Sequence, residues 1–276
     1  NQEEFSLLNL TDKKAKDNFL FFHATGFNAL TYKVLLEGLF KNLNGSINIY
    51  APDLRGHGMS KANNDPALLT SWSVYIEDCL EWVDSIDGDI IVSGHSMGAI
   101  VASRIAQARP DRVKNLILLE PVLFSPFNSL KFRLMSKLKF TRSSEMVSGA
   151  SRRRYKFGSQ NEIIESYEGR GAFKTWDRPW IENYVEGGSK ENSLGETVLT
   201  CHPSWESKTF GTSAMDNWKF LKLIDCSCYA LSGGLNSTFS EPSRKALSAL
   251  GANWKLDHFP NATHFLPMEE TENLID

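Results

Sequence analysis

The sequence has little of what marks several common protein classes. It holds only four cysteines in 276 residues, and their spacing matches no zinc site: Cys79, Cys201, Cys226 and Cys228. The formal net charge is −3, so no broad positive field recruits nucleic acid. No apolar run reaches the roughly 20 residues that span a bilayer, and the first ten residues lack the order of a secretion signal. We therefore expect a cytoplasmic protein with reduced thiols, no membrane span and no nucleic-acid partner.

Short apolar runs alternate with longer amphipathic ones along most of the chain. The runs predict buried strands at 19–22, 47–50, 90–92, 116–119 and 228–231, with outer strands at 5–10 and Trp254–Phe259. Helical spacing of apolar residues predicts helices over about 72–86 and Met97–Ala108. This alternation predicts an α/β fold, in which helices cover both faces of a mostly parallel sheet.

One long segment breaks this rhythm. Residues 125–215 are rich in arginine, serine, glycine and tryptophan, contain short helical patterns and show no clear strand. Because the segment lies between two predicted sheet strands, we interpret it as a mostly helical insertion. Residues 1–124 and 216–276 then form the core of the fold.

The most informative motif is GHSMG, at residues 94–98. It follows a predicted strand and opens a predicted helix, which is the setting of a nucleophilic serine on a tight turn. Small residues must flank such a turn, and Gly94, Gly98 and Ala99 supply them. The helix that begins at Met97 also directs its N-terminal amides toward an oxyanion formed on Ser96. The alternative is a chance match in a structural or phosphate-binding turn.

Three other segments follow predicted strands: FHATGF at 22–27, APDLRGHGMS at 51–60 and FPNATHFLP at 259–267. Together with GHSMG, and in this order, they resemble the α/β-hydrolase superfamily, in particular its lid-bearing, esterase-like branch with a serine nucleophile. The resemblance spans nearly the whole chain. It implies that His264 is the general base, that Thr25 and Met97 donate backbone amides to an oxyanion hole, and that no cofactor is needed.

Two details depart from the family pattern. Ala24 stands where the family more often has glycine, which leaves Thr25, Gly26 and Phe27 open as the first amide donor. The family often has an aspartate after the strand that ends here near residue 231, but residues 233–237 contain no carboxylate. Asn236 or Ser237 occupies that place, and neither side chain carries a negative charge.

The catalytic acid is therefore expected elsewhere. Glu120 follows the strand at 116–119 and precedes Pro121, which places its carboxylate at a carboxyl end of the sheet. In the related haloalkane dehalogenases and some lipases the acid follows this same strand. We predict a triad of Ser96, His264 and Glu120. The alternative is that Glu120 only caps the first turn of the insertion.

The other histidines are interpreted as structural. His23 and His57 lie in turns, and His95 is the variable residue of the GHSMG motif. His202 adjoins Cys201, but no second ligand pair is near, so we predict no metal site.

The predicted activity is cleavage of the carboxylic ester of a small-molecule acyl substrate through an acyl-enzyme. In the family that the chain resembles, the same triad serves thioesterases, lactonases, amidases, C–C bond hydrolases and perhydrolases, and the family also includes lyases. A ligand-binding protein without turnover is a further alternative. In the insertion, Trp176 is predicted to line an apolar acyl site, although a plain core role also fits a tryptophan. Four arginines are predicted to hold an anionic group of the substrate: Arg152, Arg153, Arg154 and Arg170. The sequence specifies no oligomeric state.

Overall fold

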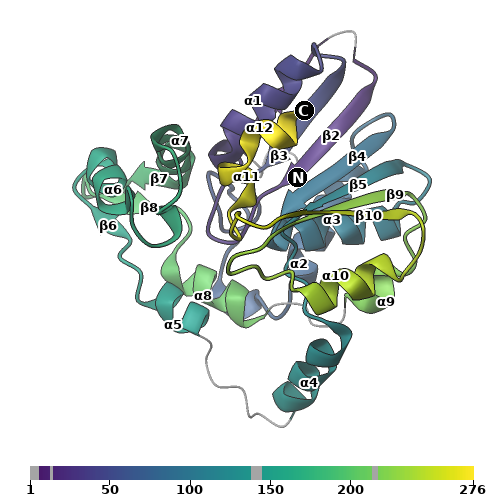
Figure 1. Cartoon of the computed structure of the whole chain (residues 1–276). Coiled ribbons are helices and arrows are strands. Elements are labelled where there is room, and N and C mark those ends of the chain that lie inside the picture. Colours follow the sequence, from purple (N-terminus) through teal and green to yellow (C-terminus); the bar gives the residue numbers. More distant parts are fainter. Residues whose placement is uncertain (1–5, 13–14, 138–144, 213–216) are drawn as a thin grey trace.

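A seven-stranded sheet is the centre of the computed structural model, which describes residues 6–12, 15–137, 145–212 and 217–276 (Figure 1). The strand order is β1-β3-β2-β4-β5-β9-β10, and only β1 is antiparallel to its neighbour. The strands are β1 (Leu7–Leu10), β2 (Asp17–Phe22), β3 (Ile47–Pro52), β4 (Ile90–His95), β5 (Val113–Leu119), β9 (Ser227–Gly233) and β10 (Trp254–Phe259). The predicted mostly parallel sheet is confirmed.

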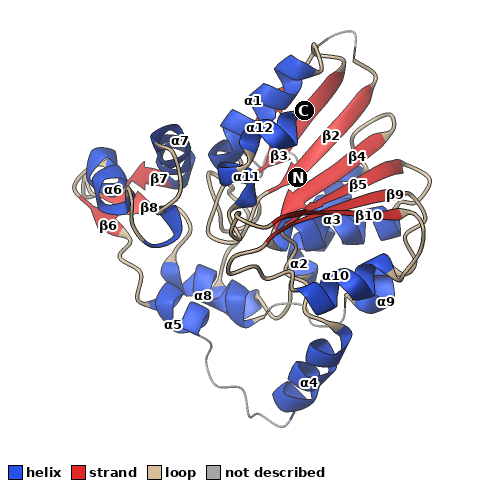
Figure 2. Cartoon of the chain, in the orientation of Figure 1, coloured by secondary structure: helices blue, strands red, loops and turns tan. Residues whose placement is uncertain are grey.

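Helices cover both faces of this sheet, as Figure 2 shows. One face carries α1 (Lys33–Asn42), α11 (Leu266–Glu269) and α12 (Thr271–Ile275), and the other carries α2 (Ser73–Val83), α3 (Met97–Ala108), α9 (Trp218–Leu221) and α10 (Glu241–Ser248). Strand β2 explains why both faces need cover: Leu20 and Phe22 pack into one apolar cluster, whereas Phe19 and Phe21 pack into the other. No helix in the described part of the chain is both long and apolar enough to cross a bilayer.

The segment between β5 and β9 contains helices and a second, smaller sheet. Its elements are α4 (Pro126–Lys137), α5 (Glu145–Ser151), β6 (Lys156–Phe157), α6 (Gln160–Tyr167), α7 (Arg178–Gly188), β7 (Ser189–Glu191), β8 (Thr197–Leu199) and α8 (Pro203–Gly211). Strands β6, β8 and β7 pair antiparallel. The expectation that this segment has no strand is therefore wrong, because strands of two or three residues are too short to show alternation. The predicted boundary at 215 and 216 lies outside the described residues.

The insertion is tied to the core by hydrogen bonds from buried side chains. The amide of Asn28 donates to the Tyr184 carbonyl over 2.9 Å, and the indole of Trp205 donates to the Arg55 carbonyl over 3.0 Å. Trp205 is only 1% exposed. Asn28 and Arg55 follow β2 and β3, so the insertion covers the edge of the sheet where parallel strands end (Figure 1). Binding sites of open α/β sheets lie at this edge.

Candidate active site

Ser96 lies on a strained turn between β4 and α3. Its φ of 57° and ψ of −115° are unusual for a residue with a side chain, and such a conformation costs about 1–3 kcal/mol. The turn fits only because its neighbours are small. A Cβ on Gly94 would overlap the backbone of Gly98, and a Cβ on Gly98 would overlap the Phe22 carbonyl on β2. Steric crowding therefore explains why both positions of the motif are glycine.

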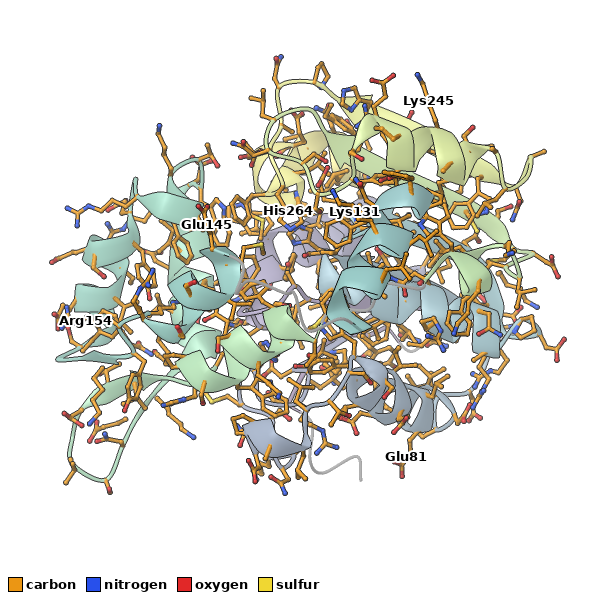
Figure 3. The ribbon with its side chains drawn as sticks, turned by 90° about the horizontal axis from the view of Figure 1, so that it is seen from below. Glu81, Lys131, Glu145, Arg154, Lys245 and His264 are labelled. Carbon is orange, nitrogen blue, oxygen red and sulfur yellow. The ribbon has the colours of Figure 1, made fainter. Side chains whose placement is uncertain are left out.

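His264, in the loop after β10, contacts both Ser96 and Glu120. Its Nε2 lies 3.0 Å from the Ser96 Oγ, and its Nδ1 lies 3.1 Å from the Glu120 Oε2. A buried carboxylate accepts a hydrogen bond, so Nδ1 carries the proton and Nε2 accepts from the serine hydroxyl. Ser96, His264 and Glu120 thus form a continuous hydrogen-bonded chain, from strand ends that are distant in sequence. Figure 3 shows His264 near the middle of the molecule.

Glu120 is fully buried and well supplied with donors. Its Oε1 accepts hydrogen bonds from the Gly233 amide over 2.5 Å and from the Ser237 hydroxyl over 2.7 Å, while its Oε2 faces His264. The backbone at Glu120 has a φ of 44°, a second strained residue at this edge of the sheet. Three donors for one carboxylate offset the cost of burying a charge. The alternative role, a cap on the insertion's first turn, does not account for these contacts.

The loop after β9 supports the acid rather than replacing it. Ser237 donates to Glu120 and in turn accepts from the Phe239 amide over 3.0 Å. Thr238 places its Oγ1 3.2 Å from the His264 Nδ1, whereas Asn236 is exposed. The sequence places Asn236 and Ser237 at the usual position of the acid, and the contact of Thr238 with His264 was not predicted. The only signal was a run of hydroxyl residues where a carboxylate is usual.

The turn predicted to donate an amide lies against the first turn of α3. The Thr25 hydroxyl is 3.3 Å from the Met97 sulfur, so the two residues predicted to hold an oxyanion are neighbours. Of the three open donors, Phe27 already donates its amide to the Ala24 carbonyl over 3.2 Å. Because the Phe27 amide is already engaged, Thr25 and Gly26 remain as candidates for the first amide donor. Gly26 has a φ of 79°, which suits glycine.

His95 links the proposed oxyanion turn to the loop of His264. Its Nε2 donates to the His264 carbonyl over 2.7 Å, and its Nδ1 accepts from the Tyr32 hydroxyl over 2.7 Å. Tyr32 in turn accepts from the Ala24 amide over 3.2 Å. Both ring nitrogens of His95 are therefore engaged with neutral partners, and burial holds the pKa of His95 well below its usual value.

His23 and His57 are likewise buried in the loops after β2 and β3. The His23 Nε2 accepts from the Leu54 amide over 2.9 Å, and the His57 Nδ1 donates to the Arg55 carbonyl over 3.0 Å. Burial lowers the pKa of His57 to about 4 and that of His23 well below the usual value.

These three neutral histidines predict that the protein loses stability in mild acid. Between the folded pKa and the unfolded value near 6.5, the unfolded chain binds more protons, so stability is complete above about pH 6.5 and falls as pH drops toward 4. Each such group contributes up to about 1.4 kcal/mol per pH unit. Thermal unfolding midpoints measured from pH 7 to 4.5 check this decline. His57→Asn, which keeps a donor for Arg55, should flatten it.

The control for this prediction is His202→Asn. His202 is exposed, and its side chain caps α8 by accepting from the Ser204 amide, a role that asparagine also fills. This variant should show the wild-type decline. Equal slopes for the wild type and His57→Asn would contradict the assignment.

The arginines predicted to bind an anionic substrate lie in different surroundings. Arg153 forms an ion pair with Glu206, and Arg154 forms one with Glu162. Arg152 and Arg170 are exposed. In Figure 3 Arg154 lies at the outer rim of the insertion, well away from His264. Arg152 and Arg153 line an open hollow of about 760 Å³ between α5 and α8, which none of the triad residues lines.

Trp176 packs near the triad in a cluster of aromatic rings. Its ring centre lies 5.2 Å from that of Phe27, which follows the Thr25 turn, and 5.7 Å from that of Phe265, which follows His264. Trp176 is 5% exposed, so it also belongs to the apolar core. Within the described ranges, no cluster of three or more acidic, histidine or cysteine side chains is arranged to bind a metal.

The chain is similar to known proteins in both sequence and fold. Residues 19–276 match the alpha/beta hydrolase family. The human monoglyceride lipase is 30% identical over 94 residues, 32% of this chain and 30% of the lipase, and lipase LipV of Mycobacterium tuberculosis is 39% identical over 80 residues, 28% of each chain. These alignments thus span less than a third of either relative. Among solved structures, the thioesterase domain from the curacin biosynthetic pathway has a TM-score of 0.75 at 18% identity, covering 98% of this chain and 92% of its own.

The family match extends from β2 to the end of the chain and so includes the GHSMG turn, Glu120 and His264. This match covers well over half of the chain. The chain therefore belongs to the alpha/beta hydrolase family.

Proposed function

We propose that the protein is a serine hydrolase that cleaves carboxylic esters through an acyl-enzyme on Ser96. The observation that carries the proposal is the pair of hydrogen bonds at His264, 3.0 Å to Ser96 and 3.1 Å to Glu120. The names of the lipase relatives support an ester rather than another acyl substrate. A reducing, cytoplasmic location is part of the proposal, because the four cysteines carry free thiols.

In the proposed reaction, His264 Nε2 takes the proton of the Ser96 hydroxyl as its oxygen attacks the ester carbonyl. Glu120 stabilises the imidazolium that forms, and His264 then gives the proton to the leaving alkoxide. Water attacks the acyl-enzyme in the same way and releases the acid. The amide of Met97, with that of Thr25 or Gly26, stabilises the oxyanion in both halves of the reaction.

The acyl chain of the substrate is proposed to bind against Phe27, Phe265 and Trp176. The three rings pack against one another, and Phe265 also contacts the His264 ring, so they offer an apolar surface beside the catalytic residues. The insertion is proposed to act as a lid that excludes water from this surface. An anionic part of the substrate is proposed to contact Arg152 or Arg170, which are both exposed.

A panel of p-nitrophenyl esters of increasing acyl length tests the function, with acyl thioesters and lactones beside it. An acyl-enzyme predicts a rapid burst of p-nitrophenol followed by slower turnover when deacylation limits the rate. Rates should be highest for esters with an apolar acyl chain. Turnover of thioesters alone, with no ester hydrolysis above background, would replace the ester proposal with a thioesterase.

A further inference from the structure

A buried ion pair of the insertion lies beside the proposed oxyanion turn, and the proposed reaction does not use it. Arg153, just after α5, places its Nη1 3.0 Å from Oε2 and 3.1 Å from Oε1 of Glu206 on α8. The side chains are 18% and 9% exposed. Arg153 also donates to the hydroxyls of Tyr184 over 2.5 Å and Tyr167 over 3.2 Å, which hold the guanidinium in one orientation.

Glu206 lies directly against the turn that follows β2. A Cβ on Gly26 would meet the Glu206 Oε1 at 2.5 Å and its carboxyl carbon at 3.1 Å, so the carboxylate packs on the Gly26 backbone. Gly26 follows Thr25, whose hydroxyl is 3.3 Å from the Met97 sulfur. A carboxylate of the insertion thus lies next to the amides proposed to bind the oxyanion.

A negative charge at this place opposes the proposed chemistry unless it is balanced. The tetrahedral intermediate carries a new negative charge on the former carbonyl oxygen, and like charges several ångströms apart in a partly buried site repel strongly enough to slow a reaction about tenfold or more. Among the described residues, the charged partner that the structure gives Glu206 is Arg153. The positive charge of Arg153 therefore determines whether the surroundings of the turn are electrically neutral.

We propose that Arg153 is a positioning residue that acts through Glu206, by neutralising and fixing its carboxylate against Gly26 so that the oxyanion turn carries no net negative charge. This inference rests on the proposed serine-hydrolase function. The insertion then contributes to transition-state stabilisation by its charge balance, besides covering the site. It also implies that the two partners of the ion pair have opposite effects on the rate.

Kinetics of Arg153→Gln, Glu206→Gln and the double variant on a neutral p-nitrophenyl ester test this charge balance. Arg153→Gln leaves an unbalanced carboxylate, so kcat should fall about tenfold or more with little change in KM. Glu206→Gln keeps an acceptor for Arg153 but removes the negative charge, so kcat should not fall. The double variant should recover the kcat that Arg153→Gln loses. A purely structural ion pair would instead make both single variants slow and unstable.

Two controls and one fallback keep the outcome decisive. Arg178→Gln breaks exposed ion pairs with Glu168 and Glu182 and should leave kcat unchanged. Arg153→Lys retains the positive charge and should keep kcat within a few-fold of the wild type. If Arg153→Gln does not fold, the double variant alone decides: wild-type kcat supports the inference, and a tenfold loss overturns it.

The failure of this inference is distinguishable from the failure of the proposed function. If a fluorophosphonate does not label Ser96 in the wild-type protein, the proposed function itself is contradicted. Wild-type protein that is labelled, together with a Glu206→Gln variant as slow as Arg153→Gln, would leave the function intact and overturn the role of Arg153.

Discussion

Replacement of Ser96 by alanine is expected to lower kcat for ester hydrolysis about a millionfold, the loss typical of triads without their nucleophile. The Ser96 hydroxyl is the atom that His264 contacts at 3.0 Å, and alanine removes that oxygen and nothing else. Alanine also has the smaller side chain in a turn at φ 57°, so the fold should be retained. Steady-state kinetics and a thermal unfolding curve measure the two effects separately.

Ser93→Ala is the matched control for this variant. Ser93 lies on the same strand, β4, is 1% exposed, and its hydroxyl has no hydrogen-bond partner among the residues that the structure describes. Its loss should leave kcat near the wild-type value. Ester hydrolysis retained by purified Ser96→Ala would contradict the assignment of the nucleophile.

Replacement of Glu120 by glutamine is expected to lower kcat about 10⁴-fold, as removal of the acid's charge does in comparable triads. Glutamine keeps the shape of the side chain but presents no negative charge to the imidazolium at His264 Nδ1, 3.1 Å away. An amide nitrogen turned toward His264 would also favour the wrong tautomer. Single-turnover kinetics separate this loss in the chemical step from any change in KM.

A second substitution then tests where an acid is able to act. Thr238 has its Oγ1 3.2 Å from the His264 Nδ1, so Glu120→Gln with Thr238→Asp should recover part of the lost rate. Asn236→Asp in the same background adds the same charge at an exposed position and should recover much less. Full activity of Glu120→Gln would show that the site works as a dyad of Ser96 and His264.

The positions of the three proposed catalytic residues were predictable because each residue follows the end of a sheet strand. The order of the strands places the loops after β4, β5 and β10 at one edge, so Ser96, Glu120 and His264 follow from three apolar runs and the residue types that come after them. The tight turn at Ser96 was also predictable, because the small residues that it requires lie within a few positions of the serine in the sequence.

Contacts between distant segments were not predictable in the same way. Arg153 was predicted to hold an anionic group of the substrate, but its partner Glu206 is 53 residues away in the sequence, and no local pattern links the two. Thr238 contacts His264 because the loop after β9 bends over Glu120, and this bend depends on the Gly233 amide and the Ser237 hydroxyl that bind the carboxylate. The strands β6, β7 and β8 are similarly defined by their pairing rather than by alternation.

The central claim, that Ser96 is a nucleophile activated by His264 and Glu120, is tested most directly by mapping a fluorophosphonate adduct with peptide mass spectrometry. One adduct per chain is predicted, on the peptide that contains Ser96, and the rate of its formation should fall strongly in Glu120→Gln and in a His264→Ala variant. Labelling that is absent at Ser96, or equally fast in wild type and His264→Ala, would contradict the account.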